Sequence, residues 1–183
     1  MTIARIYGIY KTLLTTHTYK VQAVQTGILL GMGDLISQSL IEPNETPIDY
    51  RRTLRFVVIG TVIGPTIHKW YTIIDKVVGK QQDFKTVIKK TTLDQLAMAP
   101  AMLGAFLTSI TLMEGGGIED IRNRFKKDYF AILTNNYKVW PAVQLITFRL
   151  PVDFRVLFVQ IVALGWNTYL AWRINYCNKK NKQ

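Results

Sequence analysis

Long stretches without charged residues constrain this chain more than any other feature of its sequence. The clearest runs from residue 95 to residue 113, and another covers residues 156–172. A helix needs about 20 consecutive apolar residues to cross the hydrocarbon core of a bilayer. Residues 20–41 and 53–74 form two further apolar segments with few ionisable groups. The pattern predicts an all-α integral membrane bundle of about four spans, with amphipathic interfacial helices beside it.

Proline, glycine and charged residues set the limits of these segments in a chain of 183 residues, which we expect to be a single membrane domain. Residues 75–93 should be a basic, partly helical connection, and the helix after Gly115-Gly116-Gly117 should end at Asn135-Asn136. The expected segments are an amphipathic N-terminal helix over 1–19, spans over 20–41, 53–74, 94–113 and 151–173, an interfacial or re-entrant arm over 137–150, and a basic tail over 174–183.

The charge distribution bears on both topology and partners. The chain is 49% hydrophobic and 19% charged, with a net charge of +11. The segments outside the spans alternate between strongly basic and nearly neutral. The positive-inside rule predicts this for an even number of spans with both termini on one side. Basic residues are scattered over separate loops, so we expect a lipid bilayer and a small solute or ion as partners, and no direct nucleic-acid contact. A homo-oligomer or a larger membrane complex remains open.

Each predicted span carries one face of small or polar residues, because residues three or four apart share a helix face. This pattern has two interpretations. Ionisable and amide groups could line or gate a path, or small residues could let helices pack closely, as small-xxx-small patterns do in membranes. The candidate pore-lining or gating residues are Asp34, Gln38, His68, Asp94, Asp153, Gln160 and Asn167. The residues that we interpret as helix packing are Gly27, Gly31, Gly60, Gly64, Ala97, Ala101 and Ala105.

The carboxylates need partners, because an ionised group inside a span is costly unless it is paired or faces water. The candidate charge partners are Arg52, Arg55, Arg149 and Arg155. Pairing of every carboxylate would indicate a staple that holds the bundle together. A carboxylate without such a partner would indicate a conduit. The sequence leaves both alternatives open.

Signatures of enzymes and cofactor sites are absent from the sequence. There is no HExxH motif and no Walker-type phosphate loop, and the two histidines, His17 and His68, lie far apart. We therefore expect no enzymatic activity, no metal and no cofactor. Cys177 is the single cysteine, so no intramolecular disulfide can form, and its role stays open. We interpret Trp140, Trp166, Tyr169 and Trp172 as interfacial anchors rather than as a ligand cage.

Several short stretches together resemble a known family over nearly the whole chain. The stretches are Lys20-Val21-Gln22, Gly31-Met32-Gly33-Asp34, Leu93-Asp94-Gln95, Trp140-Pro141-Ala142-Val143-Gln144 and Trp166-Asn167-Thr168-Tyr169-Leu170. They resemble the Mpv-type membrane proteins, which are related to the peroxisomal membrane protein of twenty-two kilodaltons. Within that family the resemblance points to the mitochondrial inner-membrane member. Thr147 departs from the family's asparagine, and the spacing to Pro151 is one residue shorter, which changes the hinge before the last span.

The resemblance implies an integral protein of the mitochondrial inner membrane with about four spans. It implies a channel-like role in passing small solutes or ions, in support of mitochondrial homeostasis and mitochondrial DNA maintenance. It brings no catalytic residues. Two alternatives stay open: a non-transporting scaffold of an inner-membrane complex, and a peroxisomal membrane channel of the same family.

Overall fold

The structure of the chain, a computed structural model, describes residues 3–42, 47–81, 83–147 and 152–180. These residues contain helices and no strand, which confirms the all-α prediction. The helices are α1 (Ile3–Thr16), α2 (Thr18–Ile36), α3 (Tyr50–Val78), α4 (Phe84–Leu93), α5 (Ala99–Met113), α6 (Ile118–Arg124), α7 (Phe130–Thr147) and α8 (Val152–Lys180).

Short π-helical segments extend or join several of these helices. They are η1 (Ser37–Ile41), which continues α2, η2 (Asp94–Met98), which joins α4 to α5, and η3 (Phe125–Tyr129), which joins α6 to α7. Residues 84–113 and 118–147 are therefore two unbroken helical stretches. At about 1.5 Å per residue, each is roughly 45 Å long, which exceeds the roughly 30 Å hydrocarbon core of a bilayer.

Aspartate side chains cap the starts of two helices, and a glycine follows the end of a third. Asp49 and Asp83 accept hydrogen bonds from the backbone N–H groups of Arg52 (3.0 Å) and Thr86 (3.1 Å), which caps α3 and α4. Helix α5 ends at Met113, and Gly115 comes soon after it with φ +84°, a left-handed conformation that glycine adopts without strain. The predicted stop at the triple glycine is confirmed.

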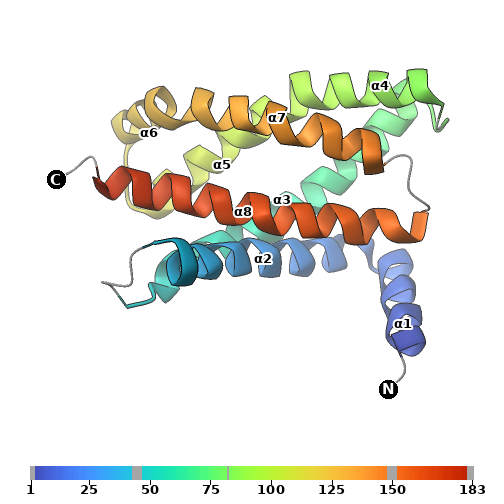
Figure 1. The fold of residues 1–183 in the computed structure, drawn as a ribbon, viewed down its shortest axis with the longest axis horizontal. Coiled ribbons are helices and arrows are strands. Elements are labelled where there is room, and N and C mark those ends of the chain that lie inside the picture. The colour runs from blue at the N-terminus through green and yellow to red at the C-terminus, as the bar shows by residue number, and fades with distance from the viewer. Residues whose placement is uncertain (1–2, 43–46, 82, 148–151, 181–183) are drawn as a thin grey trace.

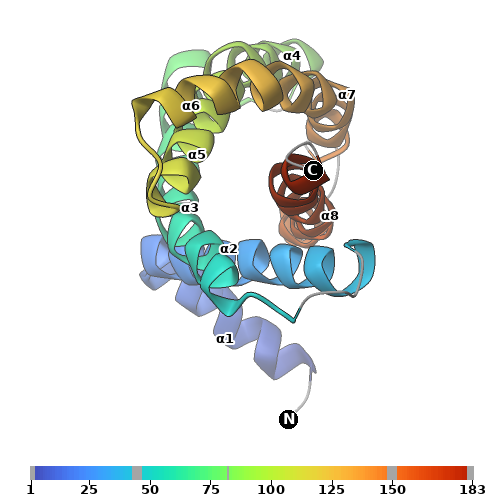
Figure 2. The same ribbon diagram turned by 90° about the vertical axis from the view of Figure 1, so that its left-hand side faces the viewer.

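Helices α7 and α8 run along the molecule's longest axis, whereas α3 and α5 cross it obliquely, as the ribbon in Figure 1 shows. Helices α7 and α8 lie side by side in both views, and α1 projects away from the rest (Figures 1 and 2). The N- and C-termini lie toward opposite ends of the long axis in Figure 1. The expectation that both termini lie on the same side of the membrane stays a prediction.

Two predicted segments can be compared with the observed helices. The connection over residues 75–93, expected to be partly helical, contains the end of α3 and all of α4, and η2 continues α4 into the helix that carries the third predicted span. The predicted helix end at Asn135-Asn136 is wrong, since α7 continues through both residues and through Pro141 to Thr147. Both asparagine side chains donate to other helices, Asn135 to Tyr169 and Asn136 to Gln95, rather than to their own backbone. Placement of residues 137–147 at an interface stays a prediction, and residues 148–151 lie outside the described part.

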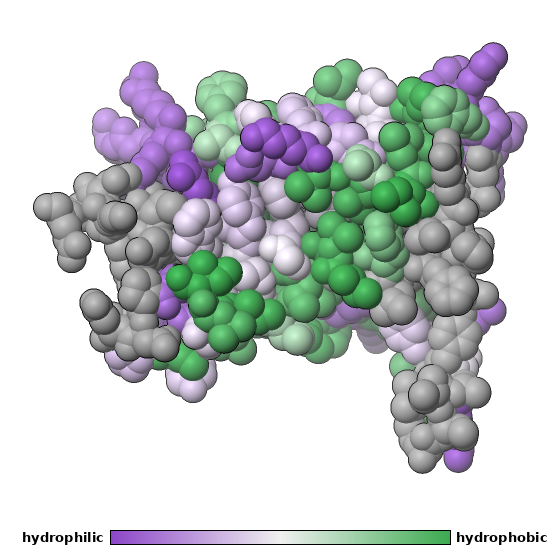
Figure 3. All heavy atoms as spheres, in the orientation of Figure 1, coloured by the Kyte–Doolittle hydropathy of each residue, from purple (hydrophilic) through white to green (hydrophobic). Residues whose placement is uncertain are grey.

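Apolar side chains cover much of the outside, as expected of a protein in a bilayer. Stripes spaced by four, each side chain exposed by 44–65%, are formed by Val24, Ile28 and Met32 on α2 and by Leu54, Val58 and Val62 on α3. On the face drawn in Figure 3, hydrophobic side chains cover much of the middle, and the most hydrophilic ones gather mainly toward the two ends. Among the described helices, the stretch Phe84–Met113 is long and apolar enough to cross a membrane, and most of its apolar window is not buried inside the molecule.

The interior combines an aliphatic core with buried polar groups. Phe56, Leu107, Ile110, Ile132 and Ile174 form the centre of the core and link α3, α5, α7 and α8. Beside them, polar and charged side chains are equally inaccessible; they include Asp34, Arg52, Asp94, Gln95, Asp128, Gln144 and Asn167. Since buried polar groups must be hydrogen-bonded, these residues define where a functional site should be sought.

Candidate functional site

Glycines bring the backbones of α2 and α3 into direct contact. A Cβ atom on Gly60 would lie 2.7 Å from the Cα of Gly27, and one on Gly64 would collide with the carbonyl oxygen of Gln22. Only glycine permits this approach, which is the close packing that the small-xxx-small pattern favours. We call this contact between α2 and α3 the glycine seam. His68 also lies on it, where its ring meets that of Tyr19 edge to face with centroids 5.2 Å apart. These residues therefore face a packed helix contact and not an open path.

Asp34 lies at the end of this seam with no solvent exposure. Its Oδ1 accepts a hydrogen bond from Nε of Arg52 at 2.6 Å. Its Oδ2 accepts from Nε2 of Gln38 and from the hydroxyl of Thr53, both at 2.7 Å. Both carboxylate oxygens are thus satisfied, one of them by a buried guanidinium.

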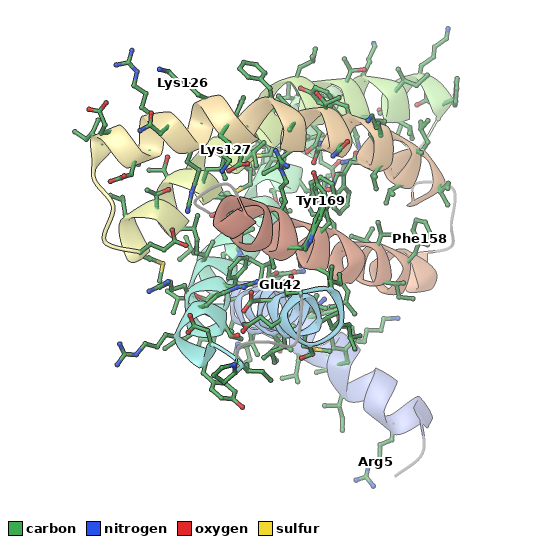
Figure 4. All side chains as sticks on the ribbon, turned by 60° about the vertical axis from the view of Figure 1, so that its left-hand side comes forward. Arg5, Glu42, Lys126, Lys127, Phe158 and Tyr169 are labelled. Atoms are coloured by element: carbon green, nitrogen blue, oxygen red, sulfur yellow. The ribbon has the colours of Figure 1, made fainter. Side chains whose placement is uncertain are left out.

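Arg52 extends the Asp34 contact into a network that joins three helices. Its two terminal nitrogens donate to Glu42 at 2.9 and 2.6 Å, and one of them reaches the carbonyl oxygen of Ala171 on α8 at 3.4 Å. Glu42 also accepts from the hydroxyl of Ser37 at 2.9 Å, and its label in Figure 4 marks its place just beneath the end of α8. We call Asp34, Gln38, Glu42, Arg52 and Thr53 the arginine network. It has the geometry of a staple.

Asp94 begins η2 and is bound differently. Its Oδ1 accepts from the indole Nε1 of Trp70 at 2.9 Å, and its Oδ2 accepts from the side-chain amides of Gln95 at 2.9 Å and Gln144 at 2.8 Å. Among the described residues, no lysine or arginine pairs with this carboxylate. We call Trp70, Asp94, Gln95 and Gln144 the amide network. It binds a buried carboxylate entirely with uncharged donors.

The amide network reaches further into α7. Asn136 donates to Oε1 of Gln95 at 3.0 Å, and the hydroxyl of Tyr137 donates to the carbonyl oxygen of Gln95 at the same distance. α3, η2 and α7 therefore converge on Asp94. A π-helical turn at this point fits the frequent occurrence of such turns at functional sites.

The two networks lie far apart. Arg52 and Trp70 are eighteen residues apart on α3, which corresponds to roughly 27 Å along the helix axis. The networks share no residue. Asp34 and Asp94 therefore do not form one site, although both belong to the same predicted set.

A third buried carboxylate was missed by sequence reasoning. Asp128 in η3 is fully inaccessible, and its Oδ1 lies 3.4 Å from a terminal nitrogen of Arg173 on α8. In the sequence it stands among the charges of a surface-like segment, so only its neighbours in space identify it. Trp70, Gln95, Gln144 and Glu42 were missed as well, although Gln95 and Gln144 both belong to the stretches that carried the family resemblance.

The remaining predicted residues are scattered. Asn167 is buried on α8 against Gly33 of α2. A Cβ atom added to Gly33 would lie 2.7 Å from the Cβ atom of Asn167. Arg55 is half-buried and forms no ion pair with another described residue. Asp153, Arg155 and Gln160 belong to α8, but their side chains lie outside the described part, as does Arg149 entirely.

The alanine stripe of the third span lies on the outside of the chain. Ala97, Ala101 and Ala105 are exposed, whereas Asp94 is buried. The cause is η2, because one extra residue in a π turn rotates the following face by about 100°. The alanines therefore do not pack against another helix of this chain, and they do not share a face with Asp94.

No cluster of three or more potential metal ligands occurs among the residues that the structure describes. The arrangement can hold helices together through the arginine network. Through the amide network, it can also present one buried negative charge that no described cation cancels.

Known proteins are similar to this chain over most of its length. Residues 111–171 match the Mpv17 / PMP22 family. Mitochondrial inner membrane protein Mpv17 of Xenopus laevis is 39% identical over 179 residues, covering 94% of this chain and 99% of that protein. The human protein of the same name is 37% identical over 171 residues, covering 92% and 97%. Protein sym-1 of Neurospora crassa is 38% identical over 167 residues, covering 89% and 95%. No solved structure matches.

The similarity extends over nearly the full length of both chains, so it is not limited to one shared segment. The names of the Xenopus and human relatives place them in the mitochondrial inner membrane. They confirm the predicted location and the predicted resemblance. The chain is a protein of the mitochondrial inner membrane and belongs to the Mpv17/PMP22 family.

Proposed function

We propose that this chain forms a channel-like conduit for small solutes or ions in the mitochondrial inner membrane, and that it thereby supports mitochondrial homeostasis and mitochondrial DNA maintenance. One observation carries the proposal. The buried carboxylate of Asp94 is bound by Trp70, Gln95 and Gln144, which are all uncharged. Ionisable residues inside a membrane bundle are costly and mark ion or proton pathways, so the uncancelled charge of Asp94 favours a conduit.

The proposal includes an arrangement in the membrane. The four predicted spans, residues 20–41, 53–74, 94–113 and 151–173, form four crossings. In place of the interfacial arm expected over residues 137–150, helix α7 with the end of η3 forms a fifth crossing, because residues 129–147 carry a single charged residue, Lys138. They are roughly 28 Å long as a helix. The charged residues of α6 then lie at one membrane surface.

The amide network suits a gate for physical reasons. Its donors come from α3, η2 and α7, so a shift of any one helix removes a hydrogen bond from the carboxylate. Removing a donor from a buried charged group is costly, on the order of 1–3 kcal/mol or more. Binding of a passing cation or proton can offset that cost. Opening and ion binding are thereby coupled.

Reconstitution of the purified protein in liposomes tests the proposal. The wild type should show conductance or solute flux that favours cations, and Asp94→Asn should lower that preference. Glu119→Gln, a charge change of the same size at an exposed position, is the control and should leave it unchanged. Pure protein that conducts nothing across a range of pH and potential would contradict the conduit.

The arginine network favours a second candidate function, a non-transporting scaffold of an inner-membrane complex. Asp34, Arg52 and Glu42 pair with one another and tie α2 and α3 to α8. A network in which these charges pair with one another holds helices together and needs no path for solutes through the protein. The scaffold predicts that Asp94→Asn lowers stability or assembly and leaves flux unchanged. The same liposomes, together with native gel electrophoresis, therefore separate the two functions.

A further inference from the structure

A groove of about 410 Å³ lies between α7 and α8, which run side by side in Figures 1 and 2. Val139, Val162 and Trp166 give it apolar walls. Gly165 keeps it open, since no atom lies within 4 Å of the place where its Cβ would stand. The groove is distinct from both the arginine network and the amide network, and neither candidate function uses it.

Three polar residues form one edge of the groove, and their hydrogen bonds fix one another's orientation. Lys138 donates from Nζ to Oδ1 of Asn135 at 3.1 Å, and Nδ2 of Asn135 donates to the hydroxyl oxygen of Tyr169 at 2.7 Å. An ammonium group can only donate, so the amide oxygen of Asn135 must face it. The amide nitrogen then faces Tyr169, whose oxygen accepts.

This orientation leaves several donors unused at the edge of the groove. The hydroxyl hydrogen of Tyr169 and two hydrogens of the Lys138 ammonium have no acceptor among the described residues. None of the described residues that line the groove is acidic. The edge therefore combines a positive charge with unused donors, which is the complement of an oxyanion.

The depth of the groove adds a second reason for a ligand. Gly165 and Lys138 lie near the middle of α8 and α7. Under the membrane placement proposed above, an exposed ammonium at this depth is costly unless an anion or water accompanies it.

We infer that the α7–α8 groove binds an organic oxyanion, with a phosphate or carboxylate at Lys138 and Tyr169 and an apolar part against Val162 and Trp166. The ligand is either a soluble organic anion or an anionic phospholipid whose chain lies in the groove. The site does not require the chain to be a conduit, so its test and that of the conduit can fail separately.

Isothermal titration calorimetry of the full-length protein in neutral detergent tests the soluble source. Phenyl phosphate serves as the probe, with inorganic phosphate as the comparison that lacks an apolar part. We expect saturable binding of phenyl phosphate and weaker binding of inorganic phosphate. Lys138→Gln should weaken binding about tenfold or more, and Tyr169→Phe several-fold, as loss of a hydrogen bond to a charged group does.

Lys126→Gln is the matched control, because it removes the same charge from a side chain that points away from the bundle in Figure 4. It should leave binding unchanged. Lys138→Arg keeps the charge and should keep most of the affinity, so it covers the case in which Lys138→Gln folds poorly. Equal losses in Lys126→Gln and Lys138→Gln would overturn the site, because they would show attraction by overall charge.

Nanodiscs test the lipid source. The protein is incorporated in phosphatidylcholine alone or with added phosphatidylglycerol, and native mass spectrometry counts the lipids that it retains. Retention of phosphatidylglycerol that Lys138→Gln loses and Lys126→Gln keeps would support the site with a lipid as its ligand. Absence of both phenyl phosphate binding and lipid retention would overturn it. Binding by protein that shows no flux in liposomes would support the groove and contradict only the conduit.

Discussion

Nε of Arg52 lies 2.6 Å from Oδ1 of Asp34, and the two residues are 6% and 0% exposed. The pair joins α2 to α3, and Arg52 also binds Glu42 and the carbonyl oxygen of Ala171 on α8. A buried ion pair adds little net stability, but loss of one partner leaves an uncompensated charge. The pair therefore fixes how three helices meet.

Removal of one partner should destabilise the fold strongly. We expect Arg52→Gln to lower the free energy of unfolding by about 3–5 kcal/mol, because the fully buried carboxylate of Asp34 then loses the cation that pairs with it. Unfolding in mixed detergent, followed by circular dichroism, measures the change. Arg51→Gln removes the same charge from the exposed neighbouring side chain and should have little effect. If the double variant Asp34→Asn/Arg52→Gln is no more stable than Arg52→Gln, the charge explanation fails.

The glycine seam gives a prediction of the opposite kind, in which one methyl group is added. Gly64→Ala would place Cβ against the carbonyl oxygen of Gln22 and should force α2 and α3 apart, costing about 1–3 kcal/mol. Gly8→Ala is the control, since nothing lies within 4 Å of its Cβ position. A helical alanine is favoured over glycine, so Gly8→Ala should be neutral or stabilising. Equal effects of the two substitutions in a thermal unfolding experiment would contradict the close contact.

The helix order predicts where the two ends of the chain lie. Under the membrane placement proposed above, in which α7 adds a crossing, tags at the N- and C-termini should be found on opposite sides of the inner membrane. Protease protection in mitochondria and in mitoplasts with an intact inner membrane measures this. Protection of both tags under the same conditions would support the even number of spans that the loop charges indicate, and would move α7 out of the membrane.

The start of α4 should respond to acid. The hydrogen bond from Thr86 to the carboxylate lowers the pKa of Asp83 below its ordinary value. The stabilisation that this cap gives is therefore present at neutral pH and is lost as the pH falls through the lowered folded-state pKa. Amide hydrogen exchange at the first turn of α4, corrected for its intrinsic pH dependence, should become faster below that value. Asp83→Asn, which caps without titrating, should remove the dependence.

Helix content and the glycine faces of α2 and α3 can be predicted from patterns within the sequence. Gly27, Gly31, Gly60 and Gly64 stand at spacings that put them on one face of each helix, and the structure brings these faces together. The partner of Asp34 was one of four candidate arginines, and only the packing of α3 against α2 selects Arg52. Local patterns predict faces, whereas partners depend on how helices meet.

The π turns explain much of what the sequence could not predict. Periodicity of 3.6 residues put Asp94 and Ala97 on one face, but η2 rotates the helix beyond Asp94, so that Asp94 is buried and Ala97 is exposed. In the same way η3 carries Asp128 inward from a segment whose charges resemble those of a solvated helix. Nothing in the composition of these five-residue segments distinguishes them from an ordinary turn of α-helix.

The backbone contact between Gly27 and Gly60 has a mechanical consequence. Helices that touch through side chains can slide when rotamers change, but α2 and α3 have no side chain between them at this point. We therefore expect α2 and α3 to move together as one rigid body. A shift that opens the amide network then moves η2 or α7 relative to this helix pair, which carries Trp70.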